Sequence, residues 1–386
     1  MELSNICEYS SKRIDSSLLT VENYVSTENM MQNKGGITLA AKVPVENSVE
    51  FLPGDILISN IRPYFRKIWL SDKKGGCSSD VLCIRALPGT DSTYLYYLLS
   101  QDSFFDYVMS GAKGCKMPRG DKSQIMQWDV DLPNFEEQHR IASILKSIDD
   151  KIQLNNRINH NLEEQIQTLY REWFIDNPKT EWATIALSEV ATFVSGYSYK
   201  GNEIVDFSET AMATIKNFER NGGFKLDGYK PISPSSNLKE EQYAELFDIL
   251  VAHTDLTQNA EVIGNAEIIL SKDSYSDIIF SMDLVKVVAK ESFPYQFLLA
   301  LLLKNPIFKS HCIGYVNGTT VLHMNKRALP DFNTQIPTCE DADRMNEIAK
   351  SIFTKMYENL CEIANLTKLR DSLLPKLMSG ELRLMK

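Results

Sequence analysis

The sequence predicts an α+β fold: two repeated globular α/β domains joined by two long helices that form an antiparallel coiled coil. Three observations support this prediction. One helical pattern runs from Phe135 to Asp176, a second runs from Asp341 to Leu377, and the segments before the two helices share one order of motifs. The predicted parts are a first domain at 1–134, a central helix at 135–178, a second domain at 179–338, and a distal helix with the C-terminal tail at 339–386.

Short apolar runs separated by turn residues predict a sheet in the first domain. Residues 56–59 follow a Pro-Gly-Asp turn and residues 81–84 follow two glycines, so both runs are predicted strands of a mixed or antiparallel sheet. Residues 92–109 carry apolar side chains at helical spacing, in one helix or in two with a break near Ser100. The next segment, 111–122, is rich in glycine and charge, which predicts a surface loop.

The central helix has neither Pro nor Gly and carries a seam whose residues are spaced alternately by four and three. Such heptad spacing predicts a partner helix. At 1.5 Å per residue the helix would be roughly 60 Å long, which favours a spacer between two bodies. Asn155 and Asn159 interrupt the seam, and they either lie in a solvated helix middle or fix the register of the pair. The seam comprises Ile141, Leu145, Ile148, Ile152, Asn155, Asn159, Leu162, Ile166, Leu169 and Trp173.

The second domain repeats the motifs of the first in the same order. Residues 247–250 match 54–57, and residues 336–337 match 132–133, each pair directly before a long helix. Six such matches occur with offsets near two hundred residues, which indicates a tandem duplication.

The distal helix repeats the seam of the central helix, again with an asparagine, Asn359, in its middle. Because one long helix follows each domain, the simplest arrangement pairs the two helices antiparallel. The alternative is that each helix is amphipathic and lies on its own domain. The seam comprises Met345, Ala349, Ile352, Met356, Asn359, Ile363, Leu366, Arg370 and Leu373.

Composition indicates an ordinary globular chain of 386 residues, with 43% hydrophobic and 24% charged residues. The net charge of −10 argues against general coating of nucleic acid but permits local basic patches. Seven scattered cysteines without a CxxC pair indicate reduced thiols and a cytoplasmic location. The N-terminus does not resemble a secretory signal, and the apolar run 293–303 is too short to cross a membrane, so it is expected to be a core helix.

Motifs that carry catalysis are absent from the sequence. It contains no GxxxxGK[ST], GxGxxG, HExxH or GxSxG motif, no Asp/Asn-Pro-Pro-aromatic tetrapeptide, and no Cys/His metal cluster. Asp55 with Asp80, and Asp248 with Asp283, are better explained as turn or cap residues than as paired catalytic carboxylates. We therefore expect no catalytic residues and no metal.

Binding chemistry is better represented. Residues 60–67 interleave basic and aromatic side chains, and residues 113–122 hold four basic residues against one acid. The matching stretches 253–259 and 317–327 favour hydrogen bonding over charge. Such side chains can grip phosphates or read base edges, although a charged run is often only a solvated face. The candidate DNA-binding residues are Arg62, Tyr64, Arg66, Lys67, Lys113, Lys116, Arg119, Lys122, Tyr199, Lys200, His253, Thr257, Gln258, Thr319, Thr320, His323 and Lys326.

A set of motifs recurs along the whole chain. They are LPNFEEQ (132–138), RIA (140–142), IDDKI (148–152), NNRIN (155–159), NLE (161–163), WF (173–174), LRDSLLPKLMSGE (369–381), and the loops KMPRGD (116–121) and GTTVLH (318–323). The helix and C-terminal motifs closely resemble those of the DNA-specificity subunit of type I restriction-modification systems, and the two loops are similar to stretches common in the target recognition domains of that family. Residues 341–350 lack the Glu-Glu-Gln opening expected there, so the start of the distal helix is not fixed.

The resemblance implies a division of labour. Each globular domain would be a target recognition domain that reads one half of a bipartite, asymmetric sequence in double-stranded DNA, and the helices would set the spacer. The helices would also dock two methyltransferase (modification) subunits, which bind S-adenosylmethionine, while a restriction subunit uses ATP for translocation and cleavage. The chain itself would then be non-catalytic and bind no cofactor, and it would not contact a membrane. The alternatives are a nuclease or methyltransferase with cryptic motifs, or a coiled-coil scaffold without base recognition.

Overall fold

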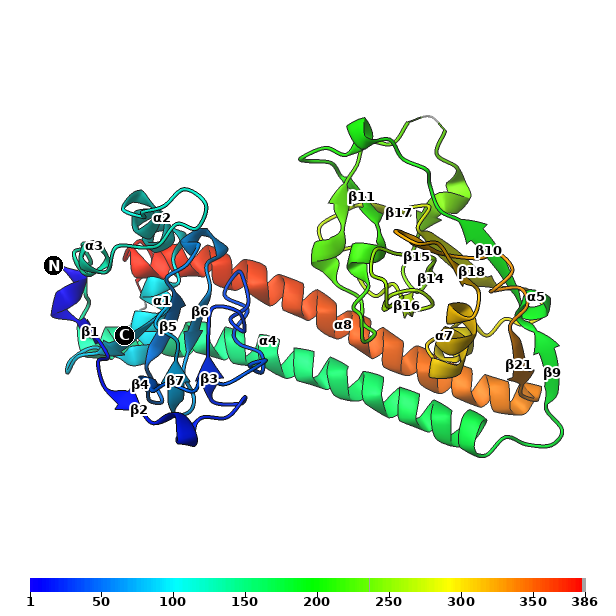
Figure 1. Cartoon of the computed structure of the whole chain (residues 1–386), viewed down its shortest axis with the longest axis horizontal. Coiled ribbons are helices and arrows are strands. Elements are labelled where there is room, and N and C mark those ends of the chain that lie inside the picture. Colours follow the sequence, from blue (N-terminus) through cyan, green and yellow to red (C-terminus); the bar gives the residue numbers. More distant parts are fainter. Residues whose placement is uncertain (236, 384–386) are drawn as a thin grey trace. The chain divides into compact units, whose positions relative to one another are not determined.

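A computed structural model describes residues 1–235 and 237–383. The chain divides into two compact units: unit 1 comprises 1–152 and 365–386, and unit 2 comprises 153–364. Each unit therefore contains a globular domain and one end of each long helix (Figure 1). The units follow spatial contacts and not the consecutive segments proposed from the sequence, so the segment boundaries stay a prediction.

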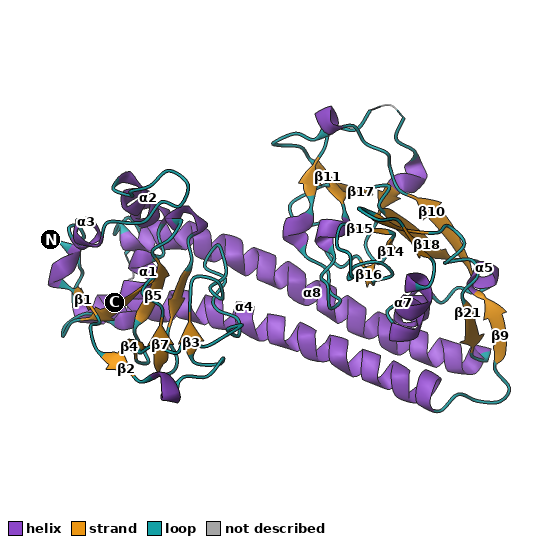
Figure 2. Ribbon diagram, in the orientation of Figure 1, coloured by secondary structure: helices purple, strands orange, loops and turns teal. Residues whose placement is uncertain are grey.

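Unit 1 contains two four-stranded sheets (Figure 2). The first is antiparallel, and its central strand β5, with the sequence ILIS, is buried along its whole length. The second sheet is mixed, since β3 runs parallel to β7. Strand β7 holds Gly75, where a Cβ would lie 2.0 Å from the Asn23 carbonyl oxygen, so only glycine fits. In spatial order the strands are β1 (Cys7–Tyr9), β8 (Val81–Ala86), β5 (Ile56–Ser59) and β6 (Ile68–Leu70), then β2 (Arg13–Ile14), β4 (Ser48–Phe51), β7 (Gly75–Cys77) and β3 (Tyr24–Val25).

Three short helices complete the globular part of unit 1: α1 (Ser92–Leu99), α2 (Asp102–Ser110) and α3 (Lys122–Met126). The break between α1 and α2 confirms the two-helix alternative. The Asp91 side chain accepts hydrogen bonds from the amides of Thr93 and Tyr94, which caps α1. These helices share one apolar core with both long helices, through residues such as Leu145 and Leu377.

Unit 2 contains four sheets, and the largest repeats the antiparallel sheet of unit 1. In spatial order its strands are β10 (Ala191–Ser195), β18 (Leu284–Ala289), β14 (Ile249–Ala252) and β16 (Ala266–Ile268). A mixed sheet comprises β12 (Lys230–Pro231), β11 (Thr210–Ala213), β17 (Asp277–Phe280) and β13 (Tyr243–Ala244). The small sheets are β15 (Thr254–Asp255), β20 (Leu322–Met324) and β19 (Val316–Asn317), and β21 (Asn333–Ile336) with β9 (Ala183–Ala186).

The short helices of unit 2 are α5 (Leu187–Val190), α6 (Gln296–Leu303) and α7 (Pro306–Ile313). The predicted core helix is confirmed as α6, in which Leu298 to Leu303 are all buried. Among the described residues, no helix combines the length and apolarity that crossing a bilayer requires.

Corresponding elements of the two units confirm the internal repeat. The antiparallel sheets have the same strand order, and α1 and α6, α2 and α7, and the two long helices each begin 204 residues apart. The turn before the central strand is also shared, with φ of +89° at Gly54 and +71° at Phe247. This left-handed backbone is unfavourable for Phe, whose ring packs edge-on against Phe297 at 5.4 Å and Tyr357 at 6.0 Å.

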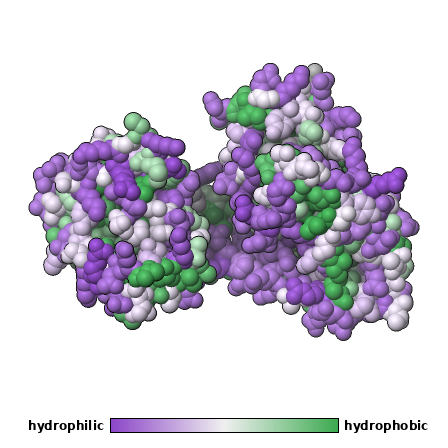
Figure 3. Space-filling view, viewed as in Figure 1, coloured by the Kyte–Doolittle hydropathy of each residue, from purple (hydrophilic) through white to green (hydrophobic). Residues whose placement is uncertain are grey.

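The long helices are α4 (Phe135–Tyr170) and α8 (Cys339–Met378). Arg171–Asp176, the last six residues of the helical pattern predicted from Phe135 to Asp176, form a π-helical segment, so the regular α-helix is shorter than this pattern. Within unit 2, Asn155 contacts Glu362 and Asn159 contacts Met356 and Asn359, which establishes antiparallel pairing. The alternative of two separate amphipathic helices is therefore wrong. Several apolar seam residues are buried, among them Leu145, Ile166, Met345 and Ala349. Hydrophilic residues predominate on the face shown in Figure 3.

Candidate nucleic-acid interface

A short hairpin in unit 1, residues 113–119, carries much of the predicted basic chemistry; we call it hairpin 1. Its arms pair through the Lys113 amide to the Arg119 carbonyl at 2.9 Å and the reverse bond at 3.0 Å. Gly114 permits the turn with φ of +99°. A bridge between Ile61 and Arg119 joins the hairpin to the segment that follows β5. The structure therefore brings two predicted binding stretches together.

The basic side chains of hairpin 1 and its edge are exposed to solvent: Lys113, Lys116, Arg119 and Lys122. Two of them have acidic neighbours. The Arg119 Nη2 atom lies 3.0 Å from Asp80 Oδ1, and Lys113 Nζ lies 2.8 Å from Asp121 Oδ2. The hydrogen bond from Lys113 lowers the pKa of Asp121 and raises that of Lys113. Asp121 also accepts bonds from the first amides of α3, so the carboxylates order this surface.

The segment after β5 divides its basic residues between two places. The Arg62 amide donates to the Pro118 carbonyl at 2.8 Å, which places Arg62 beside hairpin 1, and Tyr64 is 47% exposed. Lys67 instead donates to the Thr27 carbonyl at 2.7 Å, and burial lowers its pKa. Arg66 pairs with Asp102, away from the hairpin contacts. The structure therefore does not join Arg66 and Lys67 to hairpin 1.

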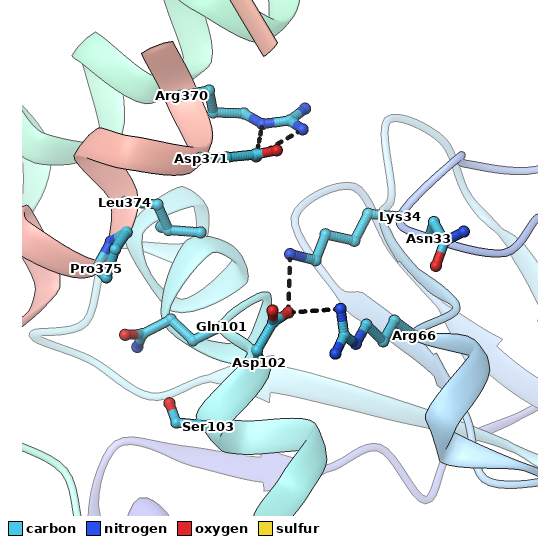
Figure 4. A pocket seen from close by; sticks show the side chains of 10 residues that line it. All are labelled: Asn33, Lys34, Arg66, Gln101, Asp102, Ser103, Arg370, Asp371, Leu374 and Pro375. Carbon is cyan, nitrogen blue, oxygen red and sulfur yellow. Dashed lines mark hydrogen bonds and ion pairs between the residues drawn. The ribbon is translucent and has the colours of Figure 1, made fainter. Parts of the chain in front are cut away.

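Arg66 lines a surface cavity of about 410 Å³ at the ends of α2 and α8 in unit 1 (Figure 4). The Asp102 Oδ1 atom lies 3.1 Å from Arg66 Nη1 and 3.5 Å from Lys34 Nζ, so both cations already form ion pairs. Across the cavity, Arg370 pairs with Asp149 and Asp371, both at 2.8 Å. The sequence analysis missed Lys34, because only the folded chain brings residue 34 next to residue 102.

An equivalent hairpin in unit 2, residues 317–323, is formed by β19 and β20; we call it hairpin 2. Asn317 pairs with His323, and Gly318 makes the turn with φ of +118°. The pairing of Thr254 with His323 joins the hairpin to the segment after β14. The Gln258 Nε2 atom donates to the Thr319 carbonyl at 2.7 Å and holds the turn. The predicted stretches of unit 2 thus also lie together.

Hairpin 2 presents fewer permanent charges than hairpin 1. Thr319, Thr320, His323 and Lys326 are exposed, whereas His253 is partly buried beneath them. Burial lowers the pKa of His253, and the nearby His323 and Lys326 lower it further, while Asp283 acts in the opposite direction. Thr257 is half-buried, and its hydroxyl has no hydrogen-bond partner among the described residues.

Two further predicted residues, Tyr199 and Lys200, lie elsewhere in unit 2. Tyr199 packs against the apolar cluster of Tyr197, Met212, Ile232 and Ile279 on the mixed sheet, and exposed Lys200 precedes a single 3-10 turn. Among the described contacts, none joins either residue to hairpin 2. A role in DNA binding for this pair stays a prediction that the hairpin geometry does not support.

The predicted register asparagines are buried between α4 and α8. Asn155, Asn159 and Asn359 are 1%, 9% and 2% exposed, so the alternative of a solvated helix middle is wrong. Asn359 Nδ2 donates to Asn159 Oδ1 at 2.7 Å, and Asn155 Nδ2 donates to Glu362 Oε2 at 2.8 Å. This geometry permits a register role, which stays a prediction.

The carboxylates considered as a catalytic pair have structural partners. Asp55 is buried and bonded to Arg85 at 2.8 and 2.6 Å, and it accepts the Leu52 amide. Asp248 accepts the Glu245 amide and pairs with Lys286 at 3.3 Å. The contacts of Asp55 and Asp248 fit their interpretation as turn residues. Within 1–235 and 237–383, no group of three or more His, Cys, Asp or Glu side chains is arranged to hold a metal ion.

Comparison with known proteins agrees with this arrangement. A family model described as "Type I restriction modification DNA specificity domain" matches residues 1–164. The HindI specificity subunit of Haemophilus influenzae is 24% identical and aligns with 98% of this chain and 98% of its own length. The chain is therefore similar to type I DNA specificity subunits. The MjaIX specificity subunit of Methanocaldococcus jannaschii is 23% identical over 95% of this chain and 86% of its own length.

A solved type I specificity subunit has the same fold. The S subunit from M. genitalium covers 100% of this chain and 96% of its own chain, with a TM-score of 0.57 and 16% identity.

Proposed function

We propose that this chain is a type I specificity subunit that reads a bipartite, asymmetric DNA target, with each hairpin reading one half. One observation carries the proposal: hairpins 1 and 2 occupy equivalent places in repeated units yet present different exposed side chains. Lys113 corresponds to Asn317 and Lys116 to Thr320, so unit 1 offers charge where unit 2 offers hydrogen-bonding groups. Two hairpins with the same backbone arrangement but different exposed side chains suit a DNA target whose two halves differ in sequence.

The chemistry of the exposed side chains suits duplex DNA. Arg and Lys neutralise phosphates, Arg can contact the O6 and N7 atoms of guanine, and Thr can bond to several base edges. The chain carries a net charge of −10, so its affinity for phosphate depends on local basic surfaces such as hairpin 1. Partner subunits would supply further phosphate contacts.

The paired helices would set the unread spacer and dock two modification subunits. Helix α4 has 36 residues and would be about 54 Å long at 1.5 Å per residue. Its exposed face is polar, with Asn161, Glu164 and Gln165 lining a shallow surface depression that a partner could cover. S-adenosylmethionine and ATP would bind to the modification and restriction subunits, and this chain would act without catalysis of its own.

Mapping of methylated adenines tests this proposal. The full chain is expressed with its modification subunits in a host that lacks adenine methylation at the same sites. A bipartite motif with a fixed spacer that depends on this chain is expected. Methylation without a sequence motif would favour the scaffold, and methylation or cleavage by the purified chain alone would favour the enzyme.

Two substitutions test the contact surface of hairpin 1. Arg119→Ala or Lys122→Ala should weaken DNA binding by the assembled complex, and Lys122→Ala should also reduce the salt dependence by about one phosphate contact. Lys42→Ala, at an exposed lysine outside the hairpin, is the control. Unchanged affinity and salt dependence for both hairpin variants would contradict the role of this surface.

A further inference from the structure

We propose that one shared hairpin position, Arg119 in unit 1 and His323 in unit 2, is the base-reading position that makes the two half-sites differ. This inference rests on the proposed function and deepens it, because it names the residue that discriminates in each unit.

Backbone hydrogen bonds fix the equivalence of the two positions. The Asn60 amide donates to the Asp80 carbonyl at 2.8 Å, and the His253 amide donates to the Asp283 carbonyl at 2.8 Å. On the other side, the amides of Gly120 and Met324 donate to the carbonyls of residues 60 and 253, at 3.2 and 2.9 Å. Arg119 and His323 therefore occupy the same register in the same arm of their hairpins.

In this arm of each hairpin, buried and exposed residues alternate, so that the side chain of Arg119 or His323 faces solvent. Pro118 and Gly120 are buried on either side of exposed Arg119, and Leu322 and Met324 are buried on either side of exposed His323. Because side chains alternate between the faces of an extended strand, the buried neighbours anchor the backbone while the central side chain faces solvent. A side chain that contacts a nucleobase needs a backbone held in place, because a displaced contact no longer distinguishes one nucleobase from another.

The other exposed positions do not meet these conditions. Lys122 and Lys326 are equivalent and identical, so they cannot make two half-sites differ, and they suit phosphate contacts. Lys116 and Thr320 lie within the hairpin turns, where neither neighbouring side chain is buried. The pair at 119 and 323 differs in identity and has a buried neighbour on both sides.

The surroundings of the shared position differ in a way that suits different bases. Asp80 lies 3.0 Å from the Arg119 guanidinium and orients it, and a guanidinium matches the two acceptors of guanine. The equivalent Asp283 instead accepts Thr254 Oγ1 at 2.9 Å and Ser281 Oγ at 3.4 Å. His323 offers one ring nitrogen at a time to a base, either as donor or as acceptor. Unit 1 should therefore prefer guanine at the contacted position, and unit 2 should not share that preference.

Exchange of the two residues tests the inference. Arg119→His, His323→Arg and the double variant are expressed as full chains with the modification subunits, and each complex selects from randomised double-stranded DNA. Each single variant should change the preference for one base over the others in one half-site by roughly tenfold or more. The other half-site and the spacer should stay unchanged. Lys122→Ala and Lys326→Ala should instead lower affinity for all sequences alike.

Three outcomes are distinguishable. If both exchanged variants select the parental motif, whether at full or uniformly reduced affinity, the inference is wrong and these positions contact only phosphate or nothing. If the parental complex itself selects no motif, the proposed function fails before the inference is reached. A change of motif confined to one half-site supports the inference. A circular dichroism spectrum and an unfolding curve equal to those of the parent confirm that each variant is folded.

Discussion

Asn359 donates a 2.7 Å hydrogen bond to Asn159 across the paired helices, in a layer where both side chains are at least nine-tenths buried. The same Asn159 donates from its own amide to the Met356 carbonyl at 3.2 Å. Two polar side chains in an apolar seam satisfy each other only when the helices keep this register. We therefore predict that this layer favours one alignment of α4 with α8.

Asn159→Leu should destabilise unit 2, because it leaves the buried Asn359 amide without its acceptor. An unsatisfied buried polar group costs about 1–3 kcal/mol, which urea unfolding would measure as a lower midpoint. The double variant Asn159→Leu/Asn359→Leu should recover much of this loss, since two apolar residues can pack in the seam. Asn156→Ala, at the neighbouring exposed position, is the control. Equal stability of all variants would exclude a structural role for this layer.

The long helices were the part of the fold most accessible from sequence. Heptad spacing predicted α4 from its first residue, Phe135, and predicted that Asn359 would lie in the middle of a matching seam. The π-helical end at Arg171–Asp176 was not predicted. There Tyr170 stacks on Phe174 at 5.1 Å, and Phe174 stacks on Trp182 at 4.9 Å. Periodicity indicates the helix but shows neither these tertiary contacts nor the local helix type.

The binding surface was less accessible from sequence. Glycine and charge predicted a surface loop at hairpin 1, and the internal repeat located the matching stretch at hairpin 2. The pairing of Arg119 with Asp80, however, joins residues from separate elements and needs the folded chain. Composition also grouped Arg66 with Arg62, although the left-handed backbone at both residues, with φ of +49° and +50°, flanks a tight turn. Because of this turn, Arg62 and Arg66 contact different partners, and the order of residues in the sequence does not show this.

Lys304→Met should strongly destabilise unit 2. The Lys304 side chain is 8% exposed and forms ion pairs with Glu163 of α4, at 3.1 Å, and with Glu267, whose side chain is 5% exposed. Burial alone would lower the lysine pKa, but the two carboxylates outweigh it and raise the pKa above its usual range. Removal of the lysine leaves Glu267 charged and unpaired, at a cost of about 3–5 kcal/mol.

Chemical unfolding would measure this loss. The double variant Lys304→Met/Glu267→Gln should recover part of it, because the neutral amide keeps an acceptor for the Gly223 amide, which bonds to Glu267 at 2.6 Å. Lys239→Met, at an exposed lysine, should leave the midpoint nearly unchanged. If Lys304→Met behaved like this control, the ion pairs would not contribute to stability.

His253 should make unit 2 less stable in mild acid. Its pKa in the folded chain lies below the ordinary value of 6.5, because burial and then the nearby His323 and Lys326 disfavour the charged form. The unfolded chain therefore takes up a proton first as the pH falls. The stabilising contribution of neutral His253 is present above pH 6.5 and is lost as the pH falls through the folded-state pKa.

His253→Asn tests this pH dependence, since Asn60 occupies the equivalent position in unit 1. Thermal unfolding at pH 7.5 and pH 5.5 should show a smaller loss of stability for this variant than for the parent. His160→Asn, at an exposed histidine on α4, should retain the parental difference. An unchanged pH dependence in His253→Asn would show that this histidine does not carry the effect.

A change in helix length tests whether the paired helices set the spacer. One heptad inserted in α4 after Asn159, with a matching heptad in α8 before Met356, keeps the seam continuous and adds about 10.5 Å to the pair. At 3.4 Å per base pair, the spacer of the methylated motif should lengthen by about three base pairs while both half-sites keep their bases. Removal of one heptad from each helix should shorten it. Insertion of three residues in place of seven breaks the heptad spacing of the seam and should abolish methylation at the bipartite sites. If the spacing of the motif stayed the same after every heptad change, the helices would not set the spacer.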